Sequence, residues 1–135
     1  MISGGCACGA VKYEVLGEFE DFCHCHCSVC RKLHGAAFVS WGKLPPRQFR
    51  FLCGEEQIVA YAFSQRADSL SCRRCASTLL VDYRRGSSMY YLALGALDTA
   101  VALPPGFHQF VASKAAWYEI EDKLPCFAEW PPGKA

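Results

Sequence analysis

Residues 23–30 read CHCHCSVC, which places four cysteines and two histidines close together in the chain. In an extended segment alternate side chains share a face, so the cysteines of residues 23–27 would point one way and the two histidines the other. A short turn after residue 27 would then bring Cys30 back to Cys25 and Cys27. Three protein ligands beside a vacant position are typical of catalytic zinc, and this spacing predicts such a site at Cys25, Cys27 and Cys30.

The remaining cysteine of this stretch, Cys23, is expected to lie outside the metal site. Three consecutive same-face positions of a regular strand span about 13 Å, at ~3.3 Å per residue, which is awkward around one ion. Disulfides, a redox pair, an iron–sulfur cluster and a closed structural zinc are the alternatives for the whole stretch. An iron–sulfur cluster would usually need four cysteines in a different run. An open zinc site is therefore the favoured interpretation.

Two further cysteine pairs, Cys6-x-Cys8 and Cys72-x-x-Cys75, have spacings that suit zinc. The first pair would share a face of an extended segment, and the second has the spacing of a zinc knuckle. Each pair alone could be incidental, and a C-x-x-C pair could also be a redox motif, although no βαβ context surrounds it. Together they suit a closed four-cysteine structural zinc, which contributes on the order of 10 kcal/mol to the folding of zinc-finger peptides.

The composition indicates one domain over residues 1–135, with 52% hydrophobic residues and a formal charge of +1. Nothing in this balance suggests a nucleic acid or a membrane as a partner. The first residues lack the basic and apolar pattern of a secretory leader, and no apolar run approaches the roughly 18 residues of a membrane span. We therefore expect a cytoplasmic protein, in which ten cysteines indicate metal binding or catalysis rather than disulfides.

Short runs rich in Val, Ile, Phe, Tyr and Leu dominate the chain, and they predict an all-β domain. The expected strands are Val11–Val15, Ala37–Trp41, Phe49–Leu52, Ile58–Phe63, Thr78–Tyr83 and Met89–Leu94. Two short segments have a possible helical pattern, Ser28–His34 and Ala115–Asp122. The expected architecture is thus a set of sheets around metal with one or two helical turns.

Four segments, in this order, resemble the glutathione-dependent formaldehyde-activating enzyme family, which includes centromere protein V: GGCACGAVKYEV, CHCSVCRKLHGAAF, SCRRCASTL and HQFVASKAAWYEIEDKLPCFAEWP. The resemblance implies an Mss4-like fold of antiparallel sheets with two zinc ions. It assigns the structural zinc to Cys6, Cys8, Cys72 and Cys75, and the catalytic zinc to Cys25, Cys27 and Cys30. It also implies a carbon–sulfur lyase that joins formaldehyde to glutathione, giving S-hydroxymethylglutathione, or cleaves such an adduct.

The sequence departs from the family pattern at Ala76, where the family often has glycine, and at the additional thiol of Cys23. If position 76 needs a positive φ, alanine costs about 1 kcal/mol there. Cys23 could tune, oxidise or poison the neighbouring triplet.

Residues near the triplet are candidates for holding a small thiol such as glutathione. Arg31 and Lys32 could bind its carboxylates, although both could equally be solvated surface charges. His34 could donate to a sulfur or act as an acid or base, or be structural. An aromatic wall over the site is an alternative for three residues that are expected to pack in the core: His108, Trp117 and Tyr118. Cys53 and Cys126 are expected to be buried or incidental thiols.

Three functions remain open at this point. The first is a zinc enzyme that acts on a small thiol–aldehyde adduct. The second is a zinc-stabilised binding module without activity. The third is a methionine sulfoxide reductase. It is disfavoured because such an enzyme would bind zinc with paired C-x-x-C motifs, and here a C-x-C motif replaces one of the two.

Overall fold

The computed structural model describes residues 1–85 and 87–133, and it is mostly β-sheet with one α-helix, α1 (Ser28–His34). The strands are β1 (Ile2–Gly5), β2 (Lys12–Val15), β3 (Asp21–Cys25), β4 (Val39–Leu44), β5 (Phe49–Cys53), β6 (Ile58–Ser64), β7 (Ala67–Cys72), β8 (Thr78–Arg85), β9 (Ser87–Ala93) and β10 (Gly106–Gln109). Four 3-10 turns complete the elements: η1 (Pro46–Gln48), η2 (Glu55–Gln57), η3 (Leu94–Ala96) and η4 (Val111–Ser113). The expected all-β fold is confirmed.

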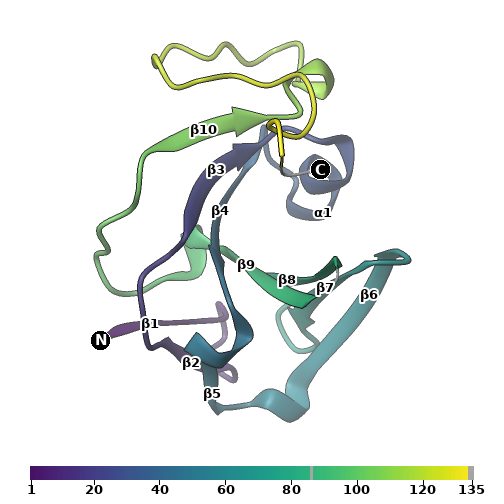
Figure 1. The fold of residues 1–135 in the computed structure, drawn as a ribbon. Helices are drawn as coiled ribbons and strands as arrows, with labels where there is room; N and C mark the ends of the chain where they lie inside the picture. Colours follow the sequence, from purple (N-terminus) through teal and green to yellow (C-terminus); the bar gives the residue numbers. More distant parts are fainter. Residues whose placement is uncertain (86, 134–135) are drawn as a thin grey trace.

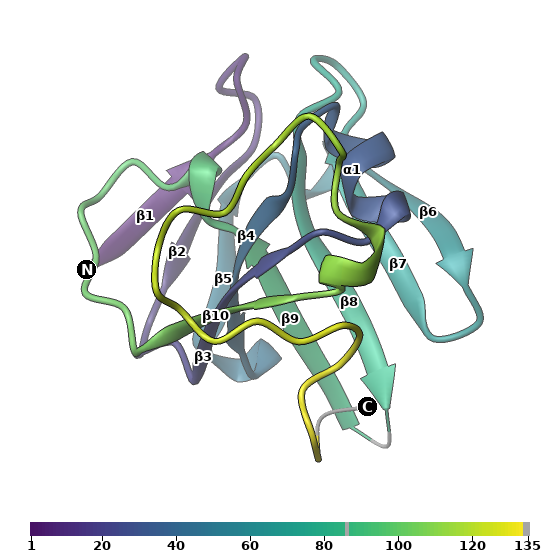
Figure 2. The same cartoon turned by 90° about the horizontal axis from the view of Figure 1, so that it is seen from above.

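The strands form a small sheet of order β1-β2-β5 and a large sheet of order β10-β3-β4-β9-β8-β7-β6. Figure 1 shows that the large sheet curls, with α1 and the end of the chain lying inside its curve. The C-terminal segment runs beside β10 (Figure 2), where the amide of His108 donates to the carbonyl of Pro125 and that of Phe127 to the carbonyl of His108. The strand pairs are antiparallel, as the family resemblance implies, except that β10 pairs with β3 in parallel.

All six strands expected from the sequence are present, with boundaries shifted by up to three residues. The sequence pattern did not indicate β1, β7 and β10, whose sequences are ISGG, ADSLSC and GFHQ. Glycine and small polar residues weaken the strand signal in each of them. These strands form because neighbouring strands supply the backbone partners.

The helix expected at Ser28–His34 is confirmed, and it ends at Gly35, which has φ 60°. The second expected helix, over Ala115–Asp122, is wrong, because this segment forms turns and irregular structure. The ammonium of Lys114 donates to the carbonyls of Ala115 and Tyr118, which a helix would use for its own amides. None of the helical segments in residues 1–85 and 87–133 is long and apolar enough to cross a lipid bilayer.

Two buried clusters connect these elements. The first joins both sheets and contains fully buried side chains such as Tyr13, Leu44 and Leu80. The second lies on one face of the large sheet and includes Cys23, Cys25 and Trp41. The second cluster therefore continues into the cysteine-rich stretch.

Candidate metal centres

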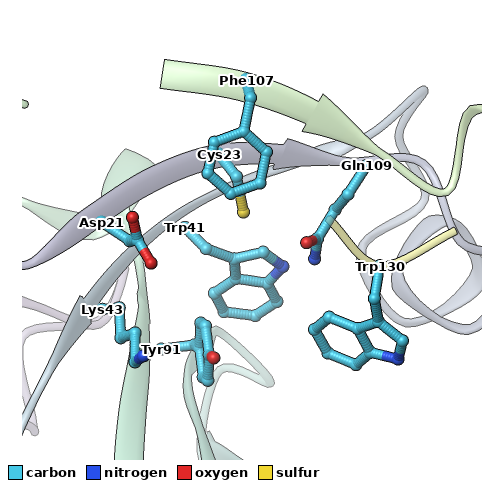
Figure 3. Close-up of a pocket in the computed structure, with 8 residues that line it drawn as sticks. All are labelled: Asp21, Cys23, Trp41, Lys43, Tyr91, Phe107, Gln109 and Trp130. Carbon is cyan, nitrogen blue, oxygen red and sulfur yellow. The ribbon is translucent and has the colours of Figure 1, made fainter. Parts of the chain in front are cut away.

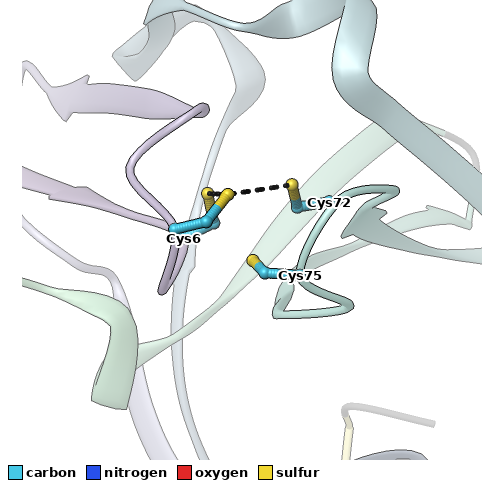
Figure 4. A group of neighbouring side chains, drawn as sticks. Cys6, Cys72 and Cys75 are labelled. Atoms are coloured by element: carbon cyan, nitrogen blue, oxygen red, sulfur yellow. Dashed lines mark hydrogen bonds between the residues drawn. The ribbon is translucent and has the colours of Figure 1, made fainter.

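The thiols of Cys6, Cys8, Cys72 and Cys75 converge, and their sulfurs all lie within 4.8 Å of one another. The Cys6 and Cys8 sulfurs are 3.6 Å apart, and those of Cys8 and Cys72 are 4.0 Å apart. Figure 4 shows the sulfurs of Cys6, Cys72 and Cys75 turned toward a common centre. A tetrahedral zinc with bonds of about 2.3 Å separates its sulfurs by about 3.8 Å, so the geometry fits zinc.

Backbone groups around this four-sulfur cluster favour charged sulfurs. The amide of Val11 lies 3.2 Å from the Cys6 sulfur, and the amide of Arg74 lies 3.4 Å from the Cys72 sulfur. Hydrogen bonds from the side chain and the amide of Ser77 lower the pKa of Cys75 to about 5. Thiolates are the form that binds metal, so these donors prepare the cluster for a cation.

Ala76 follows the second cysteine pair, and it adopts φ 66°, in the left-handed region. Its amide donates to the carbonyl of Cys72 at 2.8 Å, which closes the turn that holds Cys72 and Cys75 together. The turn thus has the conformation for which glycine is suited, although an alanine occupies the position.

The thiols of Cys25, Cys27 and Cys30 form a second cluster, again with all sulfurs within 4.8 Å of one another. Cys25 ends β3, Cys27 is the N-cap of α1, and Cys30 lies in its first turn. The Cys27 sulfur accepts from the amide of Cys30 at 3.2 Å, and the sulfurs of Cys30 and Cys25 are 3.6 Å apart. The structure brings these three residues together, while their role as ligands stays a prediction.

The three thiols divide one negative charge unequally in the absence of metal. Hydrogen bonds from Cys25 and Cys30 lower the pKa of Cys27 to about 3. The hydrogen bond with Cys27 raises the pKa of Cys25 to about 11, and hydrogen bonds with Cys25 and Cys27 raise that of Cys30 strongly. A soft divalent cation would favour the thiolate form of all three side chains, which matches the thiolate preference of zinc.

The three-sulfur cluster opens into a cavity of about 330 Å³. Its walls come from one face of the large sheet, from α1, from β6 and from the C-terminal segment; its aromatic residues are Trp41, Phe63, Tyr83, Tyr91, Phe110 and Trp130. Cys23 lies outside the three-sulfur cluster, in a narrow adjoining pocket (Figure 3). A molecule in the larger cavity can thus reach all three sulfurs.

The other side chains predicted to bind substrate lie outside this cavity. The guanidinium of Arg31 donates to the carbonyl of Ser113 at 3.1 Å, and Lys32 is exposed. The ring of His34 packs edge-on against Trp41, with 5.4 Å between centroids. Their role in substrate binding stays a prediction that the cavity lining does not support.

His24 of β3 and His26, which follows the strand, both contact His108, on the opposite face from Cys23 and Cys25, as the alternation predicted. Nε2 of His26 lies 2.8 Å from Nδ1 of His108, whose Nε2 lies 2.9 Å from a carboxylate oxygen of Asp122. With the proton of His108 on Nε2, its Nδ1 accepts from His26. Burial lowers the pKa of His26 to about 4, so the ring is neutral at pH 7. This chain of contacts holds the back of the loop that carries Cys25, Cys27 and Cys30.

Several features were not indicated by the sequence pattern. Asp122 and the aromatic residues of the cavity come from distant segments, and no spacing rule connects them to the cysteines. Cys53 and Cys126, expected to be buried or incidental thiols, are exposed. Trp117, expected in the core, is 75% exposed.

Comparisons with known proteins indicate the family to which the chain belongs. The sequence profile of a family described as glutathione-dependent formaldehyde-activating enzyme matches residues 1–113. A Halomonas elongata protein named "Putative glutathione-dependent formaldehyde-activating enzyme" is 29% identical over 97% of this chain and 89% of its own. A Schizosaccharomyces pombe protein named as an uncharacterized lyase is 27% identical over 66% of this chain and 63% of its own.

A solved structure agrees with these sequence matches. The crystal structure of a Rhodobacter sphaeroides protein superposes with a TM-score of 0.61 and 26% identity, covering 73% of this chain and 90% of the other. The profile match spans most of the described residues, including both cysteine clusters. The chain therefore belongs to the glutathione-dependent formaldehyde-activating enzyme family.

Proposed function

We propose that the chain catalyses reversible carbon–sulfur bond formation between a small thiol, such as glutathione, and an aldehyde. The family match and the lyase-named relative support a glutathione-related formaldehyde-activating or lyase function. The observation that carries the finer proposal is the three-sulfur cluster opening into a cavity. A metal held by four protein sulfurs would have no position left for a substrate, whereas one held by three would. The predicted cytoplasmic location suits this chemistry, because glutathione keeps thiols reduced there.

A zinc ion held by Cys25, Cys27 and Cys30 would offer an open position for a substrate thiolate and keep that sulfur nucleophilic. The four-sulfur cluster would hold a second zinc with no position left for substrate. Its role in the proposal is to fix the fold around the first site.

The residues of the cavity would position the aldehyde. The substrate sulfur bonds to the carbonyl carbon, the π electron pair moves to oxygen, and the oxygen takes a proton from water; cleavage is the reverse. The amide of Gln109 points between Trp41 and Trp130 (Figure 3), and its N–H groups can donate to the carbonyl oxygen as charge develops there. Gln109 stands opposite Cys25 in the strand register, which places it beside the sulfurs.

The experiment compares Cys27→Ser with the wild type and with Cys53→Ser. Serine keeps a hydrogen-bond acceptor at the N-cap of α1, so the helix start survives while one sulfur is lost. Cys53 is exposed and lies outside both sulfur clusters, so its substitution is a matched control. Adduct formation and cleavage are followed by nuclear magnetic resonance with glutathione and formaldehyde, against the spontaneous rate.

We expect Cys27→Ser to lose at least about 100-fold in catalysed rate while Cys53→Ser keeps wild-type activity. Full turnover by Cys27→Ser with normal zinc content would contradict the proposed role of the cluster. A wild-type protein with two inert zinc ions and no turnover of any adduct would favour the binding module instead.

A further inference from the structure

The cavity beside the three sulfurs has an unusual lining for an enzyme whose relatives are named for glutathione. Among the described residues that line it, no side chain carries a carboxylate, an ammonium or a guanidinium. The polar side chains besides the tyrosines, tryptophans and cysteines are Ser64 and Gln109. Glutathione at neutral pH carries carboxylates and an ammonium group. A carboxylate or an ammonium placed against the aromatic part of these walls, away from the sulfurs, would lose its water without gaining a charged partner there.

The aromatic walls support one another, so the cavity is formed before a ligand arrives. The ring of Trp130 lies 5.1 Å from that of Phe110 and 5.8 Å from that of Tyr83, and Tyr83 lies 6.1 Å from Tyr91. Phe110 has φ 58°, which a bulky residue rarely adopts, and its amide donates to the carbonyl of Glu129. The backbone is thus held in an unfavourable conformation at a residue of the wall.

Charged residues of neighbouring segments do not line this cavity. Asp21 and Lys43 line the narrow adjoining pocket of about 10 Å³, where they stand opposite each other in the register of β3 and β4. Arg31 is directed to the carbonyl of Ser113. Formaldehyde has two heavy atoms and would leave most of the 330 Å³ unfilled.

Resting on the proposed function, we propose that the substrate carries an apolar, preferably aromatic, group next to the reacting atoms, and that this group fills the cavity. The apolar group belongs either to the aldehyde or to the thiol. The charged ends of a glutathione co-substrate would then lie outside the cavity. The site would be selective for hydrophobic thiol–aldehyde adducts over S-hydroxymethylglutathione.

The first arm of the test measures binding, which does not depend on turnover. Calorimetry on the purified protein, with its zinc content measured, compares phenylmethanethiol, 2-mercaptoethanol and glutathione. We expect phenylmethanethiol to bind at least about tenfold more tightly than the other two, since a single methylene in an apolar pocket can be worth about tenfold or more.

Variants locate this preference in the cavity. Trp130→Ala and Phe63→Ala remove wall side chains that come from the C-terminal segment and from β6. Each should weaken the binding of phenylmethanethiol about tenfold and leave that of 2-mercaptoethanol unchanged. Trp117→Ala removes the same type of side chain as Trp130→Ala, but from an exposed position outside the cavity. It should change the affinity for neither phenylmethanethiol nor 2-mercaptoethanol. Two independent wall variants keep the test valid if one of them fails to fold.

The second arm follows adduct formation from 2-mercaptoethanol with formaldehyde, propanal or phenylacetaldehyde, each relative to its spontaneous rate. Faster catalysis with phenylacetaldehyde than with the other aldehydes would place the apolar group on the aldehyde. Tighter binding of phenylmethanethiol without any preference among the aldehydes would place it on the thiol. Equal or tighter binding of glutathione, with no aldehyde preference, would overturn the inference. Selective binding with no turnover of any adduct would instead refute the proposed function and leave the selective cavity standing.

Discussion

The two cysteine clusters both gather thiol sulfurs around a common centre, but they differ in which parts of the chain supply those sulfurs. The four-sulfur cluster joins residues far apart in the chain, since Cys8 and Cys72 are separated by 64 positions. The three-sulfur cluster takes all its thiols from residues 25–30 and adjoins a cavity. A metal that closes a long loop stabilises the fold, whereas one held by a single loop adds little tertiary constraint. The first cluster therefore suits structure, and the second suits chemistry.

The largest effect expected from this comparison comes from Cys72→Ser. Cys72 is buried and belongs to the main hydrophobic cluster as well as to the four-sulfur group. Losing its sulfur should remove the zinc proposed for this cluster. Structural zinc contributes on the order of 10 kcal/mol to the folding of zinc-finger peptides, so we expect loss of the cooperative thermal transition. Circular dichroism melting measures this directly.

The same measurement on Cys27→Ser provides the contrast. We expect its transition to persist, because the three-sulfur cluster connects no distant segments. If Cys27→Ser unfolds as completely as Cys72→Ser, the division between a structural and a chemical cluster is wrong.

A smaller effect is expected from His108→Ala, which acts on the back of the metal-binding loop. His108 is 1% exposed and contacts both His26 and Asp122. Alanine would leave a buried nitrogen of His26 without its partner, which costs about 2 kcal/mol of unfolding free energy. Urea denaturation should show this loss, with faster zinc release from the three-sulfur cluster alone. Unchanged stability would mean that the histidine contacts do not support the loop.

The smallest effect should come from Ala76→Gly, and it should be stabilising. Ala76 has φ 66° and is exposed, so glycine would relieve the backbone without removing a buried contact. We expect a gain of about 1 kcal/mol in unfolding free energy, seen as a higher urea midpoint. A loss of stability would show that the flexibility of glycine in the unfolded chain outweighs the relief.

How far the sequence predicted this structure depends on the range of the interactions. Local rules sufficed for the grouping of Cys25, Cys27 and Cys30, because strand alternation and one turn of helix bring them together. They failed at Ala115–Asp122, where the side chain of Lys114 takes the carbonyls that a helix needs. Phe63 and Trp130 reach the cavity only through the curl of the large sheet and the return of the C-terminal segment, for which no short pattern exists.

The central claim is that the four-sulfur cluster is closed and the three-sulfur cluster is open. Zinc retention in the presence of a chelator, with and without a competing thiol, tests it most directly when native mass spectrometry counts the ions on folded protein. We predict two zinc ions per chain, of which one leaves readily when thiol is present and the other stays until the chain unfolds. Two ions that are equally inert, or that leave together on unfolding, would contradict the claim.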